Sequence, residues 1–255
     1  MEESERMFDS FYYIHVPKTG GRHLKYNVTN RLKATFKEKG IAFPNSEFDT
    51  PTTSSHAPWS NLNITDNTYL ISVFREPSER LVSLFCHLKL KKHMHLDVPT
   101  AKIELFQWLD SNKDYLNDVQ SKMVLFDDTK EDNHVSIENF DPSSDIAAPG
   151  IFKANYIDDK ELLDSRLKRF NILMRMNDLR TDANVQHIRE KILTDFDFPQ
   201  NLISTPIRTN PSHSNKFSHE LFDSLSVSEK QYLIDYNPMD TEVWNTDSYF
   251  YKFPA

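Results

Sequence analysis

The stretch Phe11-Tyr-Tyr-Ile-His-Val-Pro-Lys-Thr-Gly-Gly-Arg-His-Leu24 joins an apolar segment to a helical one through a loop that holds two of the chain's four glycines. This order predicts a strand over residues 11–16, a tight turn, and a helix over residues 20–37. Glycine lets main-chain N–H groups approach a ligand closely, and the first turn of a helix offers unpaired N–H groups at the positive end of its dipole. The loop is therefore a candidate phosphate cradle, to which Lys18 adds a point charge and Thr19 a hydroxyl.

The loop departs from both common nucleotide-binding patterns. In the ordinary P-loop the lysine follows the glycines, whereas here Lys18-Thr19 precedes Gly20-Gly21 and the first glycine of the pattern is missing. The G-x-G-x-x-G order of a dinucleotide site is absent as well. An ordinary ATP or GTP site is not indicated, and a plain strand-to-helix turn that uses glycine stays open as the alternative.

A second strand-to-helix unit follows a long loop. The run Thr68–Phe74 is rich in β-branched and aromatic residues, which is typical of a buried strand, and Pro77 suits the first turn of a helix. Apolar residues then recur at helical spacing, which predicts a helix over residues 77–93. Arg75 directly follows the strand, so we expect it at the carboxyl edge of the sheet, with Ser83 two turns into the helix. The planar fork of an arginine suits a phosphate group.

Strands and helices alternate along the rest of the chain. We expect a strand over residues 170–176, mainly helical structure over residues 100–125, and helices over residues 158–169, 182–195 and 226–236, the last opened by a capping box. Residues 196–219 are expected to be irregular. Alternation of this kind predicts an α/β fold of three layers, with a central parallel sheet flanked by helices. The length suits one domain over residues 1–255, with residues 1–10 as a polar tail.

The composition indicates which partners and which cellular compartment to expect. The net charge of −8 argues against a general nucleic-acid binder, whose surface is basic. No run approaches the roughly 20 apolar residues of a membrane span, and residues 1–10 carry no basic-then-apolar leader, so we expect a cytoplasmic protein. The single cysteine, Cys86, rules out an intramolecular disulfide and lies on an apolar helix face, where we expect a buried thiol.

These segments resemble motifs of the sulfotransferases. Val16-Pro-Lys-Thr-Gly-Gly21 is similar to the loop that holds the 5′-phosphosulfate of 3′-phosphoadenosine 5′-phosphosulfate (PAPS) in that family. Phe74-Arg-Glu-Pro-Ser-Glu-Arg80, together with Ser83, is similar to the motif that holds its 3′-phosphate. The likeness is greatest to the carbohydrate branch that includes the heparan sulfate and uronyl 2-O-sulfotransferases. It extends to Leu116–Val124, which resembles the family's Asn-x-x-Gln-[Ser/Thr]-[Lys/Arg] segment.

The resemblance implies a P-loop-like fold and the transfer of a sulfuryl group from PAPS to a hydroxyl of a carbohydrate or glycan-like acceptor, without a metal. It also implies a set of donor-binding residues: Lys18, Thr19, Gly20, Gly21, Arg22, His23, Arg75, Ser83 and Arg208. Lys18 is expected to act in catalysis too, because it can offset the charge that grows on the leaving 5′-phosphate. For Arg22 and His23, simple solvation stays open as the alternative.

A general base is expected as well, because the acceptor hydroxyl is a weak acid. In the 2-O branch a histidine in the loop between the two motifs has this role, and here His56 is the only histidine between His23 and His87. An imidazole can accept a proton near neutral pH. An ordinary loop histidine is the alternative, and Glu38 or Glu47 becomes the candidate if the chain follows the branches that use a glutamate.

Several other polar residues leave two interpretations open. Gln120, Ser121 and Lys122 either face the cleft, as the resemblance implies, or lie on a plain helix surface. Arg80 is expected to bridge acidic neighbours, and His15 to be a packed core histidine. Two functions remain as alternatives to sulfuryl transfer: a P-loop-like kinase of a small molecule, which would need a magnesium-binding carboxylate, and a non-catalytic binder of adenosine bisphosphate.

Overall fold

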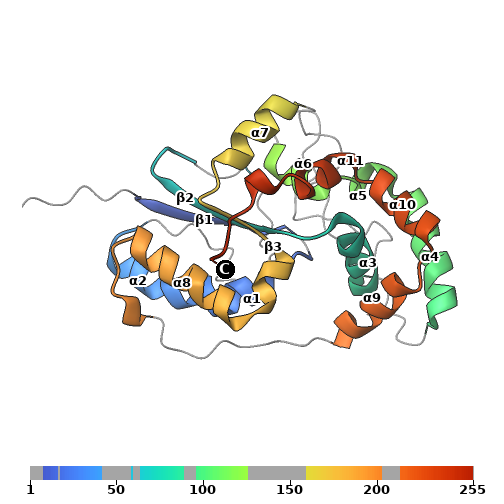
Figure 1. The fold of residues 1–255 in the computed structure, drawn as a ribbon, viewed down its shortest axis with the longest axis horizontal. Helices are drawn as coiled ribbons and strands as arrows, with labels where there is room; N and C mark the ends of the chain where they lie inside the picture. The colour runs from blue at the N-terminus through green and yellow to red at the C-terminus, as the bar shows by residue number, and fades with distance from the viewer. Residues whose placement is uncertain are drawn as a thin grey trace, which may run out of the picture.

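A computed structural model describes the chain over residues 8–16, 18–41, 59, 64–88, 96–125, 159–202 and 213–254. Within these ranges the centre of the molecule is one sheet of three parallel strands (Figure 1). The strands lie in chain order across the sheet as β1 (Ser10–Ile14), β2 (Thr68–Phe74) and β3 (Ile172–Arg175). The predicted α/β class with a parallel sheet is confirmed.

The register brings the carboxyl ends of the three strands to one edge of the sheet. Ile14 is aligned with Ser72, and Phe74 with Arg175, so the segments that leave the strands start close together. Every residue of β1 and β2 is buried, as is expected of parallel strands that are covered on both faces. In open α/β sheets this is the edge at which ligands bind.

The first hydrophobic core lies on one face of the sheet. Alternate strand residues such as Phe11, Tyr69 and Ile172 point into it, as the period of two along a strand requires. The helices that cover this face are α1 (Gly21–Leu24), the π-helix η1 (Lys25–Thr29), α2 (Asn30–Glu38) and α8 (Asp182–Asp195). In Figure 1 they form the layer below the sheet.

The second core gathers the other alternate residues, among them Ile14, Phe74 and Leu173. Its helices are α3 (Pro77–Leu88), α4 (Val98–Ser111), α5 (Lys113–Leu116), α6 (Val119–Leu125), α7 (Lys160–Lys168), α9 (His213–Asp223), α10 (Val227–Asp235) and α11 (Pro238–Trp244). Three short 3₁₀ segments complete the described elements: η7 (Met176–Arg180), η8 (Gln200–Leu202) and η9 (Asp247–Tyr249). The sheet is thus enclosed between two helical layers.

Most elements lie where the sequence predicts them. Both β2 and α8 begin and end at the predicted residues. The helix expected over residues 20–37 is present from Gly21 to Glu38, but a π-helical segment divides it. Within that segment the carbonyl of Asn27 accepts a hydrogen bond from Nε of Arg189 on α8, 2.7 Å away. This bond joins residues far apart in the chain, so no local sequence pattern could predict the π-helical turn that it accompanies.

One expectation about the helices needs correction. Residues 196–219 are not all irregular, because α9 occupies residues 213–223 and buries Leu221 completely. The mainly helical structure expected over residues 100–125 is confirmed, and it consists of three helices. Asn112 ends the first of them, with its Nδ2 donating to the carbonyl of Trp108 at 2.8 Å. Asp118, with φ of +49°, adopts the left-handed backbone that separates the other two.

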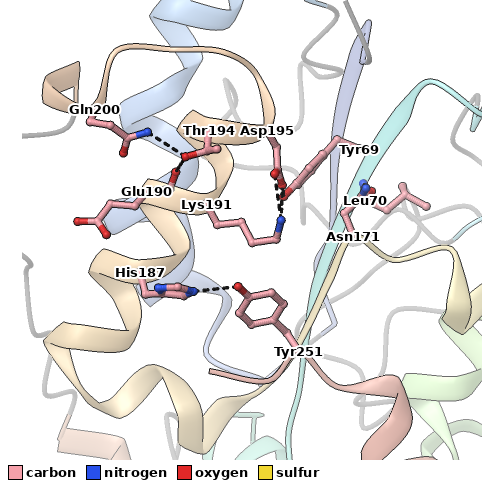
Figure 2. A network of polar contacts seen from close by, with 10 residues as sticks. All are labelled: Tyr69, Leu70, Asn171, His187, Glu190, Lys191, Thr194, Asp195, Gln200 and Tyr251. Atoms are coloured by element: carbon pink, nitrogen blue, oxygen red, sulfur yellow. Dashed lines mark hydrogen bonds and ion pairs between the residues drawn. The ribbon is translucent and has the colours of Figure 1, made fainter. Parts of the chain in front are cut away.

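Polar contacts fasten α8 and the C-terminal segment to the sheet (Figure 2). The hydroxyl of Tyr69 on β2 donates to the carboxylate of Asp195, which also pairs with Nζ of Lys191. Tyr251 donates its main-chain N–H to the carbonyl of Leu173 at 2.7 Å, so the C-terminal segment runs beside β3. The hydroxyl of the same tyrosine lies 2.8 Å from Nε2 of His187.

Candidate functional site

The loop after β1 has the backbone of a cradle. Lys18 and Gly20 both have positive φ angles, +67° and +86°. A side chain at Gly20 would be strained at that angle, and its Cβ would lie only 3.3 Å from Cγ of Met176. Thr19 is buried, and its Oγ1 donates to the carbonyl of Val16 at 2.9 Å. The backbone therefore favours glycine at this position, the packing leaves little space for a Cβ, and the threonine hydroxyl closes the turn.

Helix α1 starts directly at this loop. Gly21 is its first residue, and the N–H of His23 donates to the carbonyl of Gly20 at 2.8 Å. Together with η1 and α2 it forms an almost continuous helical segment from Gly21 to Glu38. The positive end of that segment thus lies at the carboxyl edge of the sheet, beside Lys18.

Arg75 lies at the same edge, one residue after β2. Its side chain is only 7% exposed, and its Nε donates to Oε2 of Glu79 at 3.2 Å. Burial lowers the pKa of Arg75, and the neighbouring carboxylate of Glu79 opposes that shift. The guanidinium keeps its charge, because the unperturbed pKa of arginine is far above neutrality. A nearly buried cation with several N–H donors is suited to an anionic ligand.

Arg75 lies just before α3, and Ser83 lies within it. Arg75 pairs with Glu79 in the first turn of α3, and Ser83 lies four residues after Glu79 on the same side of that helix. Ser83 is buried. On the next turn, burial raises the pKa of the Cys86 thiol to about 12, while the charges of Lys18 and Arg75 act to lower it. The charges of both cations thus act on the same residue of α3.

The main chain of Arg75 is clamped by one side chain. Oε1 of Gln120 accepts from the N–H of Arg75 at 2.8 Å, and Nε2 of Gln120 donates to the carbonyl of Arg75 at 2.9 Å. Gln120 is completely buried near the start of α6. It lies behind the arginine and supports it, so the alternative of a plain helix surface for this residue is wrong.

Acidic residues hold α6 in turn. The carboxylate of Asp240 accepts from the N–H groups of Gln120 and Ser121, at 3.1 and 2.7 Å. Oδ1 of Asp118 accepts from the N–H of Asp240 at 2.9 Å. Burial, followed by the charge of Asp240, raises the pKa of Asp118 to about 7. The segments around residues 118–121 and 237–240 are therefore one buried network.

Arg80 belongs to this network. It is fully buried, its Nη2 donates to the carbonyl of Leu116 at 3.1 Å, and burial lowers its pKa while the charges of Asp240 and Asp118 oppose that shift. Its Nε and Nη1 have no hydrogen-bond partner within the described part of the chain. The expected structural role next to acidic residues is thus supported by its surroundings.

The model of the sulfotransferase family matches this chain over residues 7–249. The chain belongs to the sulfotransferase family. Sulfuryl transfer is the general activity of that family, whose usual donor is PAPS. Comparisons with curated proteins and with solved structures give no match. The family match therefore establishes the class of transferase and leaves the acceptor and the branch to be proposed.

The structure places the other predicted residues of this sulfotransferase as follows. His23 is half-buried beside Asn27, and burial lowers its pKa, with Asp182 opposing that shift. Arg22 lies in α1, and nothing is described of its side chain. His56 and Arg208 lie outside the described residues, as does Glu47. The donor-binding and base roles of these residues stay predictions.

Some expectations about neighbouring residues change. His15 is not inside the first strand, because β1 ends at Ile14, and it is half-buried with its ring 5.3 Å from that of Tyr13. In the described ranges no group of three or more His, Cys, Asp or Glu side chains is placed to hold a metal ion. The part of the sulfotransferase that the structure describes contains no helix that is both long and apolar enough to cross a bilayer.

Two residues of the site are missing from the sequence-based prediction. Met176 packs against Gly20, and Arg180 lies 4.0 Å from the carboxylate of Glu79. Both belong to η7, the segment that leaves the carboxyl end of β3. Ligands bind at the carboxyl ends of the strands in open α/β sheets. Because a strand was expected over residues 170–176, the same rule could have placed the segment after β3 at the site.

Proposed function

We propose that this sulfotransferase transfers a sulfuryl group from PAPS to a hydroxyl of a carbohydrate or glycan-like acceptor. The observation that carries the proposal is that the glycine loop after β1 and the buried Arg75 after β2 lie at the same edge of the sheet. A donor with phosphates at both the 5′ and the 3′ position of its ribose suits two separate cationic positions. PAPS, when bound, supplies the sulfuryl group and leaves as adenosine 3′,5′-bisphosphate.

The described residues fit such a donor. Lys18, with its left-handed backbone, and the start of α1 are suited to the 5′-phosphosulfate, where main-chain N–H groups and a helix dipole favour negative charge. Gly20 supplies the left-handed backbone of this turn, with a φ of +86°. The nearly buried Arg75 and the hydroxyl of Ser83 are suited to the 3′-phosphate.

Lys18 and His56 have the catalytic roles in this proposal. The ammonium of Lys18 lies at the loop and offsets negative charge on the leaving 5′-phosphate, and fixed charges of this kind need no reorganisation during the reaction. His56 removes the proton from the acceptor hydroxyl as the acceptor oxygen attacks in line. The place of His56 in the loop between the two motifs supports this role, because the resemblance to the 2-O-sulfotransferases implies a catalytic histidine in that loop.

Transfer of labelled sulfate tests the proposal. The purified chain is incubated with PAPS carrying a labelled sulfuryl group and with a panel of uronic-acid polysaccharides, oligosaccharides and simple phenols. Label on a carbohydrate, lost in the Lys18→Ala variant and retained in a Lys160→Ala control, is the expected result, because Lys160 is an exposed residue paired with Glu242. Label on the phenols alone would overturn the carbohydrate assignment.

A further inference from the structure

We infer that Arg180 is a second arginine for the 3′-phosphate of the donor and acts together with Arg75. The inference rests on the proposed function and adds a residue to the same site. Arg180 ends η7, the short segment that follows β3, so it reaches the sheet edge from a strand that the two sequence motifs do not include. Its place beside Arg75 results from the fold alone.

Two guanidinium groups converge on one carboxylate oxygen. Oε2 of Glu79 lies 3.2 Å from Nε of Arg75 and 4.0 Å from Nη2 of Arg180. The positive charge of Arg180 also acts to lower the pKa of Arg75, which places the two cations within electrostatic reach of each other. In this structure a single carboxylate oxygen thus marks a point at which an anion is attracted by both arginines.

The charges around this point favour an added anion. Glu79 brings one negative charge to two positive ones. The nearby carboxylate of Glu76 caps α3 by accepting from the N–H groups of Ser78 and Glu79, and it acts on Arg75 more weakly than Arg180 does. A phosphate carries about two negative charges, so it would balance the two arginines better than the single carboxylate of Glu79 does. It also offers more acceptor oxygens.

The two arginines differ in accessibility in a way that suits a binding site. The side chain of Arg75 is 7% exposed and held by its neighbours, whereas that of Arg180 is 54% exposed. A preformed cation at the bottom of a site and a more accessible one at its rim can close on a ligand from two sides. The neighbouring Arg175 does not compete for this role, because its Nη2 donates to the carbonyl of Trp244 and to Asp247.

The segment that carries Arg180 also contacts the other half of the proposed donor site. Met176, the first residue of η7, is the side chain that a Cβ at Gly20 would meet at 3.3 Å. One five-residue segment therefore links the loop proposed for the 5′-phosphosulfate with the pair of arginines proposed for the 3′-phosphate. The position of Arg180 is thus coupled through η7 to the loop proposed for the 5′-phosphosulfate.

Calorimetric binding of adenosine 3′,5′-bisphosphate and of adenosine 5′-phosphate tests the inference. Three variants are compared with the unmodified chain: Arg180→Ala, Arg75→Ala and, as a matched control, Arg169→Ala. Arg169 is a similarly accessible arginine whose carboxylate neighbour is Asp66, but it lies at the amino end of the sheet. Circular dichroism and melting temperatures establish that each variant is folded.

We expect Arg180→Ala to weaken binding of the bisphosphate about tenfold and to leave binding of adenosine 5′-phosphate within about twofold, as the loss of one partly exposed charge-assisted bond implies. Arg169→Ala should change neither. The inference is wrong if Arg180→Ala leaves bisphosphate binding unchanged while Arg75→Ala weakens it, or if Arg180→Ala weakens both ligands equally. If the unmodified chain shows no preference for the bisphosphate, the proposed function itself fails.

Discussion

The amide of Gln120 forms two hydrogen bonds with the main chain of Arg75, donating to its carbonyl at 2.9 Å and accepting from its N–H at 2.8 Å. Beyond the end of β2, this side-chain amide thus forms the hydrogen bonds to the main chain that a neighbouring strand would form. It fixes the backbone from which the guanidinium projects. Because Asp240 holds the start of α6, the position of Arg75 depends on residues more than a hundred positions away in the chain.

Replacing Gln120 by alanine should therefore weaken both the fold and donor binding. Two buried main-chain groups of Arg75 lose their partners, which costs about 1–3 kcal/mol of unfolding free energy for each group left unsatisfied. Binding of adenosine 3′,5′-bisphosphate should weaken about tenfold in calorimetry, since the guanidinium is no longer held in place. The control is Gln231→Ala, which removes an exposed amide that bonds only with Asp235 in the described structure. Equal affinity in the Gln120 variant and the control would contradict the positioning role.

Lys18→Ala should lower turnover with PAPS by about a hundredfold or more, because a fixed positive charge beside the developing negative charge is lost. The donor is kept saturating, so that weaker binding does not contribute to the result. Because Lys18 has a φ of +67°, Lys18→Gly serves as a second variant that relieves backbone strain while it removes the charge. Both variants should be slow; a Lys18→Gly enzyme with near-normal turnover would show that the charge has no catalytic part.

The raised pKa of Asp118 predicts how the free energy of unfolding changes with pH. Its pKa in the folded chain is raised from 3.8 to about 7, so the folded state binds this proton more tightly than the unfolded state does. The contribution of Asp118 is thus most favourable below about pH 4 and is lost as the pH rises through about 7. Urea unfolding at pH 5 and pH 8 should show a drop that Asp118→Asn largely removes. The asparagine keeps an acceptor oxygen for the N–H of Asp240. An unchanged pH profile in Asp118→Asn would mean that other groups are responsible.

Asp195→Ala should lower thermal stability. The carboxylate accepts from the hydroxyl of Tyr69 and pairs with Lys191, and it ties α8 to β2 (Figure 2). Its loss leaves the largely buried tyrosine hydroxyl without this partner, which should cost about 1–3 kcal/mol. The matched control is Asp110→Ala, because Asp110 accepts from the hydroxyl of Tyr232 at an exposed position, where the loss should be below about 1 kcal/mol. Scanning calorimetry compares the two, and equal losses would contradict the account.

The strands and the two segments that we propose to bind the donor could be predicted from the sequence because their signals are local. A run of β-branched and aromatic residues marks Thr68–Phe74, and both this strand and α8 were placed at their observed bounds. The clamp on Arg75, the π-helical turn held by Arg189 and the approach of Arg180 to Glu79 could not be predicted in the same way. Each depends on contacts between segments that only the tertiary fold brings together.

Helix α9 shows the same limit within one element. Its apolar residues Phe217 and Leu221 are spaced for a helix, yet the polar residues before them favour an irregular segment. Packing against α3 in the second core stabilises the helix instead. Tertiary burial of this kind outweighs local propensity, which is a weak guide by itself.

Calorimetric titration of the unmodified chain with adenosine 3′,5′-bisphosphate, adenosine 5′-phosphate and ATP, without magnesium, tests the central claim most directly. The account predicts a clear preference for the bisphosphate, and it predicts that Arg75→Ala removes this preference while binding of adenosine 5′-phosphate changes little. No binding of the bisphosphate, or a preference for ATP that appears when magnesium is added, would contradict a PAPS-dependent site and favour a kinase.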